Sequence, residues 1–278
     1  MEKSFFTPKE ITVNCINIGL YKTKQTWLQL IILGVLAGAF IAFASEGSSA
    51  AIHTIQSVGL AKTLAGALFS TGLMLVLIAG GELFTGNTLL VISCIHGSVK
   101  WQQLFKNWFW VYLGNFIGSI IIVFFIIKSG QLNFSDGLLG GFTIKIAVYK
   151  THLTFENALF MGILCNWLVC LAVWMSYGAK DITGKLLAIF FPIWLFITSG
   201  FEHSIANMYY IPAGIIAKSN PNWVSKAFAL GVTPEKLSGL NWNTFITKNL
   251  IPVTIGNIIG GCLFVGIAYW FSYNNGDV

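Results

Sequence analysis

The sequence predicts an all-α polytopic membrane protein with six transmembrane helices, arranged as an inverted repeat in which the second and fifth helices are broken. Its mean hydropathy is +0.75, with 55% hydrophobic and only 9% charged residues. Apolar runs of at least about 18 residues recur along the chain, and each is long enough to cross a bilayer core of about 30 Å as a helix. Similar segments also recur in the same order in both halves. We therefore expect residues 1–278 to form one membrane domain.

The N-terminal leader, residues 1–26, is polar and precedes the first apolar run near Trp27. It is too charged, and the apolar run begins too late, for a cleaved signal peptide. Thr7, Pro8 and Glu10 have the spacing of a capping box with proline at the first helical position. The leader is therefore predicted to contain a short interfacial helix.

The apolar runs set the expected spans. They cover residues 28–46, 60–83, 104–127, 155–177, 185–199 continued by 205–217, and 249–272. Long loops follow the third and fifth spans. The first three spans form one repeat at 27–127, and the last three form the second at 155–272. Because four lysines lie in the leader and long loops count less, the charge distribution favours cytoplasmic N- and C-termini in the cell inner (plasma) membrane.

The internal repetition is visible as three matched pairs of segments. "KNWFWVYLGNFIG" (106–118) matches "KNLIPVTIGNIIG" (248–260), and "LGVLAGAFIAFA" (33–44) resembles "MGILCNWLVCLA" (161–172). Between them, a glutamate is followed five residues later by an asparagine in each half. Each half has an odd number of spans, so the second copy enters the membrane from the opposite side. This inverted repeat is a common plan for channels and transporters.

The second and fifth spans carry helix-breaking residues at corresponding places. Gly80, Gly81 and Gly86 mark the first break, and Ser199 and Gly200 mark the second. A broken helix frees backbone N–H and C=O groups, which must find partners at membrane depth. The polar residues at the breaks are Glu82, Asn87, Glu202 and Asn207. We interpret them first as structural partners of the freed backbone, and only second as groups that contact a solute or proton.

His203 and Thr85 are the candidates for solute contact, one at each break. A lone intramembrane histidine is often a core residue with satisfied hydrogen bonds, but His203 lies at the break beside Glu202. Histidine titrates near neutrality and can hold or lend a proton. One hydroxyl and one imidazole suit a small monovalent anion, whereas a cation would call for ligating carboxylates or carbonyls.

The composition and motifs exclude several other classes. The net charge of +6 comes entirely from lysine and favours anionic headgroups or anionic solutes over nucleic acid. The five scattered cysteines indicate neither disulfides nor a metal site, and no cofactor is expected. The chain has no H-E-x-x-H motif, phosphate-binding loop or Asn-Pro-Ala pair. A non-transporting membrane scaffold remains an alternative, although a scaffold has no need of two opened helices. A membrane enzyme ranks third, because no nucleophile constellation is present.

The motifs around the breaks resemble those of the formate/nitrite transporter family over nearly the whole chain. The matching segments are "GELFTGN" (81–87), "CNWLVCLAVW" (165–174), "FPIWLF" (191–196) and "GFEHSIANMYYIP" (200–212). They are most similar to the formate channel branch, and the hydrosulfide channel branch shares the same core. The resemblance implies an aquaporin-like fold and a homopentamer with one pore in each protomer.

The resemblance also implies roles for individual residues. Thr85 and His203 would face each other at the pore centre, and the family's Ω loop would follow Gly81. The outer constriction would be formed by Phe69, Leu73 and Phe196. The inner constriction would be formed by Leu83, Phe84 and Val169. Lys150 would draw anions into the outer vestibule. Asn166 and Asn207 would be its polar neighbours or would tie the loops.

A transport hypothesis follows from these assignments. Formate, or a similar small anion such as nitrite, enters under the attraction of Lys150 and meets an apolar constriction where a full charge is costly. A proton relayed from His203 or from water neutralises it, and the neutral acid crosses. Hydrosulfide transport is the main alternative within the family. The expected partners are these small anions, membrane lipid and further copies of the chain.

Overall fold

The structure, a computed structural model that describes residues 3–273, contains six helices long and apolar enough to cross a membrane. They are α2 (Trp27–Ile52), α3 with its π-helical continuation (Val58–Gly80), α5 (Trp101–Ser129), α7 (Phe155–Gly178), α8 (Ile182–Ser199) and the helix formed by α12 to α14 (Trp242–Tyr273). The described residues contain no β-strand, only an isolated bridge between Phe5 and Ala179. The predicted all-α, six-span architecture is confirmed.

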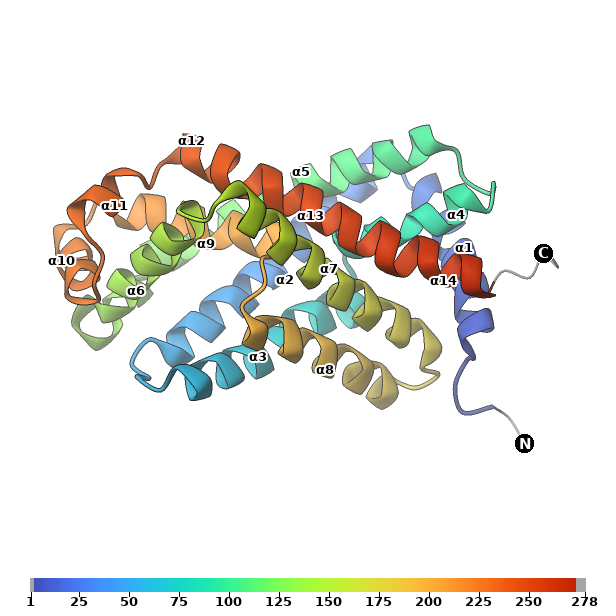
Figure 1. Ribbon diagram of the computed structural model, residues 1–278, viewed down its shortest axis with the longest axis horizontal. Coiled ribbons are helices and arrows are strands. Elements are labelled where there is room, and N and C mark those ends of the chain that lie inside the picture. Colours follow the sequence, from blue (N-terminus) through green and yellow to red (C-terminus); the bar gives the residue numbers. More distant parts are fainter. Residues whose placement is uncertain (1–2, 274–278) are drawn as a thin grey trace.

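A glycine with positive φ stands at the end of each broken helix. The second span ends at Gly80, with φ +100°, rather than at residue 83, and Gly81 is extended. After the break the chain resumes as a 3₁₀ turn (Gly86–Leu90) and α4 (Val91–Ile95). The fifth span ends at Ser199, where Gly200 has φ +77°, and α9 (Ser204–Ala217) follows. Figure 1 shows the extended segment between α8 and α9 near the middle of the molecule.

Two spans are longer than the apolar pattern predicts. The first continues through polar residues to Ile52 instead of ending at 46. Serine hydroxyls in this stretch donate to carbonyls one turn earlier, for example Ser45 to Ile41 and Ser49 to Ser45, so the polar side chains are satisfied within the helix. The last span begins at Trp242 rather than 249, because Asn241 caps it.

The two long loops contain helices that the hydropathy pattern does not reveal. The loop after α5 contains α6 (Phe134–Thr151), and the loop after α9 contains α10 (Pro221–Ala229) and α11 (Pro234–Ser238). The segments predicted as long loops are therefore largely helical. Glycines on α6 allow close packing: a methyl group at Gly140 would overlap the ring of Trp223 on α10. Tertiary packing, rather than local helix propensity, therefore stabilises α6.

The two halves pack in the same way. α2 crosses α5 at glycines in the first half, and α7 crosses α13 (Ile251–Gly261) at glycines in the second. In Figure 1, α13 lies along α7, and α3 lies beside α8 where the halves meet. The leader helix α1 (Pro8–Lys24) begins at the Thr7–Glu10 capping box. It precedes α2, the first span of the first half, as α6 precedes α7, the first span of the second half. The matched elements therefore extend N-terminally beyond 27–127 and 155–272.

The close approach of α2 and α5 predicts a specific loss of stability. A methyl group at Gly118 would overlap the Val35 carbonyl, so Gly118→Ala is expected to destabilise the protein by about 1–3 kcal/mol. Gly47, on α2, has open space around it, and Gly47→Ala is the matched control that should melt at or slightly above the wild-type temperature, because alanine favours the helix. Melting temperatures of the detergent-solubilised proteins test this. Equal melting of both variants would contradict the packing.

Candidate functional site

Thr85 and His203 meet at the point where the two helix breaks approach each other. The Thr85 Oγ1 lies 2.9 Å from His203 Nε2, and both residues are buried, at 0% and 3% exposure. His203 is also the N-cap of α9, because its Nδ1 accepts the Ala206 N–H at 3.0 Å. An Nδ1 that accepts carries no proton, so the neutral imidazole has its hydrogen on Nε2. Nε2–H therefore donates to the Thr85 hydroxyl oxygen.

The carbonyl of Thr85 is held by groups from α7 and from its own turn. Asn166 Nδ2 donates to it at 3.2 Å, and the Thr88 hydroxyl donates to it at 2.7 Å. Cys170 Sγ lies 3.4 Å away. Asn166 also donates to the Asn257 carbonyl at 2.6 Å and so ties the first break to α13. The structure thus places Asn166 beside Thr85, between the first break and α13.

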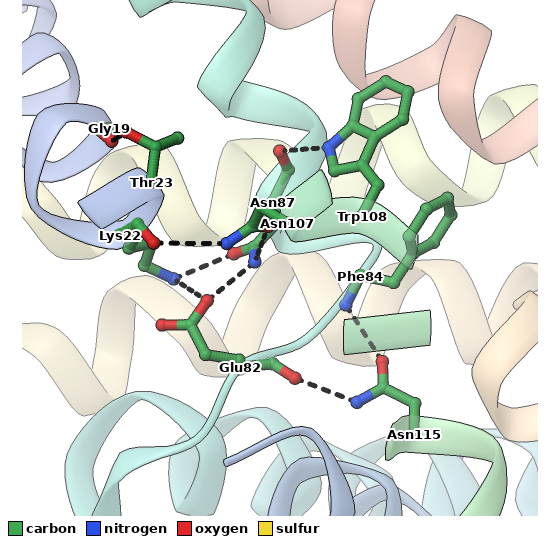
Figure 2. Close-up of polar contacts among 9 residues, drawn as sticks. All are labelled: Gly19, Lys22, Thr23, Glu82, Phe84, Asn87, Asn107, Trp108 and Asn115. Carbon is green, nitrogen blue, oxygen red and sulfur yellow. Dashed lines mark hydrogen bonds and ion pairs between the residues drawn. The ribbon is translucent and has the colours of Figure 1, made fainter. Parts of the chain in front are cut away.

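At the first break, Glu82 belongs to a compact buried group of charged and amide side chains (Figure 2). Its Oε2 accepts from Lys22 Nζ at 3.1 Å and from Asn87 Nδ2 at 2.6 Å. Lys22 also donates to Asn87 Oδ1 at 2.8 Å, and Asn87 donates to Asn107 Oδ1 at 2.9 Å. Lys22 comes from α1, so this group fastens the leader helix to the break.

The second break contains the same arrangement. Lys150 Nζ lies 2.8 Å from Glu202 Oε1, and Asn207 Nδ2 donates to Glu202 Oε2 at 2.6 Å. Asn207 also donates to Asn249 Oδ1 at 2.7 Å, and Asn249 donates to the Lys150 carbonyl at 2.9 Å. Lys150 lies near the end of α6, so it fastens α6 as Lys22 fastens α1. Of the two asparagines expected as polar neighbours of Lys150, Asn207 belongs to this group and Asn166 does not.

Two further asparagines bind the backbone that the breaks set free. Asn115 Nδ2 donates to the carbonyls of Gly34 and Glu82, both at 2.8 Å, and its Oδ1 accepts the Phe84 N–H at 3.0 Å. Asn257 makes the equivalent bonds in the second half, to Gly162, Glu202 and Ser204. Backbone groups that would be unsatisfied at membrane depth are thereby paired.

Sequence reasoning missed one lysine and four asparagines that bind the glutamates, their amide partners or the backbone at the breaks. Lys22, Asn107 and Asn249 were not singled out, nor were Asn115 and Asn257. The matched segments contained four of these: the Lys-Asn and Gly-Asn pairs supply the asparagines. For Lys22 the signal was "YKTKQT" (21–26) against "YKTHLT" (149–154), which places Lys22 opposite Lys150.

Phe69 and Phe196, two of the three residues assigned to the outer constriction, lie together beside the ring of His203. Phe69, Leu73 and Phe196 are all buried. The rings of Phe69 and Phe196 meet edge to face with centroids 5.7 Å apart, and Phe196 stacks on the His203 ring at 6.1 Å. An apolar layer therefore covers the imidazole on this side.

The residues assigned to the inner constriction do not all face the same way. Leu83 lines a small cavity with Leu73 and Lys22. Phe84 instead packs against the rings of Trp108 and Tyr112, facing an apolar groove beside α5 and α13. Val169 is buried on α7, and Val173, one helical turn later, lines the small cavity. The structure thus brings Leu83 and Leu73 together and turns the Phe84 ring away from them.

A cavity of about 690 Å³ opens on the side of Lys150 and Glu202. We call it the Lys150 vestibule. Lys150 lines it, and its ammonium group is 5.2 Å from the Tyr210 ring centroid as well as paired with Glu202. Within residues 3–273, no group of three histidine, cysteine, aspartate or glutamate side chains is placed to hold a metal ion.

The comparison with known proteins decides which group of proteins these features belong to. The model of the formate/nitrite transporter family matches residues 9–271. The chain belongs to the formate/nitrite transporter family. It is therefore an integral membrane transport protein rather than an enzyme.

Individual family members are similar over nearly their full lengths. The chain is 42% identical to the formate channel FocA of Escherichia coli (strain K12), covering 92% of this chain and 90% of that protein. It is 36% identical to a probable formate transporter of Methanothermobacter thermautotrophicus, covering 98% and 99%. A solved pentameric formate channel with formate bound superposes with a TM-score of 0.78 at 38% identity, over 90% of this chain and 98% of that one.

Proposed function

We propose that this protein carries small monovalent anions of weak acids across the membrane, formate first and nitrite also, through a pore in each protomer centred on Thr85 and His203. The observation that supports this most strongly is the contact between the Thr85 hydroxyl and His203 Nε2, where two broken helices meet. Its relatives named as formate channels support the choice of formate. By the same likeness, we propose a homopentamer in the inner membrane, and the four lysines of the leader favour cytoplasmic termini.

The proposed path begins in the Lys150 vestibule. An anion is attracted by the lysines there and then meets Phe69, Leu73 and Phe196, where a full charge is costly. Beyond them lie the hydroxyl and imidazole, followed by the small cavity that Leu83 and Lys22 line. A lysine paired with a buried glutamate stands at each end, so an ammonium group is available to donate a hydrogen bond to an anion from either side.

Neutralisation of the anion takes place at His203 or by water. In the resting arrangement the imidazole offers an Nε2–H, which can turn from Thr85 to an arriving carboxylate. A second proton on the ring must go to Nδ1, which caps α9 through the Ala206 N–H. Charging the imidazole therefore costs the cap bond, and a relay through His203 is coupled to the first turn of α9.

Hydrosulfide is the second candidate, because it is also a small monovalent anion of a weak acid and would use the same groups. A scaffold without flux is the candidate of another class. A flux assay separates the scaffold from the transporter, and a direct comparison of formate with hydrosulfide separates the two solutes.

The proposed pore centre predicts a large effect of one hydroxyl. Thr85→Val keeps the shape of the side chain but leaves the Nε2–H of His203 unpaired and offers an anion no hydroxyl. Formate uptake by proteoliposomes is expected to fall by about tenfold or more, since an unmet buried hydrogen bond costs about 1–3 kcal/mol. Thr247→Val, at an exposed threonine that bonds only to Asn243, is the matched control. Wild-type uptake by Thr85→Val would overturn the proposal.

A further inference from the structure

The Lys150 vestibule is far larger than its proposed solute requires. At about 690 Å³ it has the volume of pockets that bind drug-sized molecules, which run from about 300 to 1,000 Å³. Formate has only three non-hydrogen atoms. The vestibule therefore has room for a larger ligand above the pore entrance.

The charges of the vestibule favour an anion. Lys62, Lys145 and Lys150 line it, whereas its one acidic residue, Glu202, is already paired with Lys150. Lys62 Nζ lies over Gly200, 3.2 Å from the position that a Cβ would occupy there, so this ammonium group stands at the second break itself. Neither Lys62 nor Lys145 forms an ion pair with any residue in the described part of the chain. The cavity therefore holds positive charge in excess of negative.

The walls of the vestibule are largely apolar and aromatic. Aromatic side chains come from α6, from the break and from α9; they are Phe142, Tyr149, Phe201 and Tyr210. Aliphatic residues such as Ile52, Leu138 and Ile197 complete the surface. A pocket with apolar walls and a few placed cationic groups is suited to a ligand that has both a ring and a negative charge.

The exit toward the pore centre would hold back such a ligand. Phe69 and Phe196 close the path with a ring-to-ring contact, and both are at most 2% exposed. A six-membered ring is much wider than formate and cannot follow it between these side chains in this arrangement. A ring-bearing anion would therefore remain in the vestibule and obstruct the entrance.

We propose that the Lys150 vestibule is a binding site for amphipathic monoanions that carry a ring, such as aromatic carboxylates and sulfonates, held by Lys62 and Lys145, and that their binding blocks small-anion flux. The block rests on the proposed function, whereas the binding does not. The site would thus recognise a class of anion that the pore does not carry.

Benzenesulfonate is the appropriate probe, because it stays charged and does not cross lipid as a neutral acid. We expect it to bind the purified protein with a dissociation constant on the order of millimolar, as measured by calorimetry, and to block formate uptake over the same concentrations. Benzenesulfonamide, a neutral molecule of nearly the same shape, should do neither.

The double variant Lys62→Gln/Lys145→Gln tests the site itself. It should weaken both binding and block by about tenfold, whereas Lys9→Gln/Lys185→Gln, at lysines that do not line the vestibule, should change neither. Formate flux with no benzenesulfonate binding would overturn the inference and leave the proposed function standing. Lysine-dependent binding of benzenesulfonate without any formate flux would overturn the proposed function and leave the binding site standing. Binding that ignores the Lys62/Lys145 substitution would also overturn the inference.

Discussion

The variant His203→Asn is expected to remain folded and to lose the pH dependence of formate flux. Asparagine is among the best N-cap residues, so its Oδ1 can replace Nδ1 as the acceptor of the Ala206 N–H. Unlike an imidazole, it has no ring nitrogen that can exchange a proton with the solute between about pH 5 and 8. Formate uptake by proteoliposomes should therefore be slower than wild type and nearly flat over this range.

Comparison with His203→Phe separates the two roles of the imidazole. Phenylalanine removes the cap as well as the proton, and a lost N-cap costs about 0.5–2 kcal/mol, so this variant should melt at a lower temperature than His203→Asn. His96→Asn is the matched control, because His96 lies in a surface turn and bonds to Ser98. If His203→Asn kept the wild-type pH profile of uptake, the relay through this residue would be wrong.

The variant Lys150→Met is expected to lose about 3–5 kcal/mol of stability, because it leaves the buried carboxylate of Glu202 without its cation. Glu202 is 1% exposed and keeps only its amide partners, Asn207 and Asn249. The neutral double variant Lys150→Met/Glu202→Gln removes both charges and should regain most of the lost stability. Melting of the detergent-solubilised proteins measures both changes.

Flux should not recover with stability in this double variant. If Lys150 itself contacts the incoming anion, formate uptake stays below wild type, because the net charge of the vestibule is unchanged but its ammonium group at the second break is gone. Lys22→Met/Glu82→Gln, at the equivalent pair 3.1 Å apart, is the matched comparison at the other break. A single Lys150→Met variant as stable as the double variant would show that the ion pair does not support the break.

Glycine placement and internal repetition predicted the breaks well. Gly80 and Gly200 take positive φ values as a helix ending in membrane requires, and the matched segments lie where the halves pack alike. The hydropathy pattern could not predict α6, because its glycine-rich sequence has low helix propensity and its stability comes from contact with Trp223 and α9.

The polar groups at the breaks were only partly predictable. The spacing of glutamate and asparagine indicated a structural role, but the partners Lys22 and Lys150 lie on elements remote in sequence. The match that links the two lysines is only a few residues long. The direction of the Phe84 ring, away from Leu83, depends on the backbone path through the break, which no sequence pattern records.

The most direct test of the central claim is the initial uptake of formate, nitrite, hydrosulfide and chloride by liposomes that contain the purified wild-type protein, compared across pH. We predict formate uptake far above that of protein-free liposomes, dependence of its rate on pH, and little passage of chloride, which forms no weak acid to be neutralised. Formate uptake no faster than in protein-free liposomes, or chloride uptake as fast as formate and independent of pH, would contradict the account.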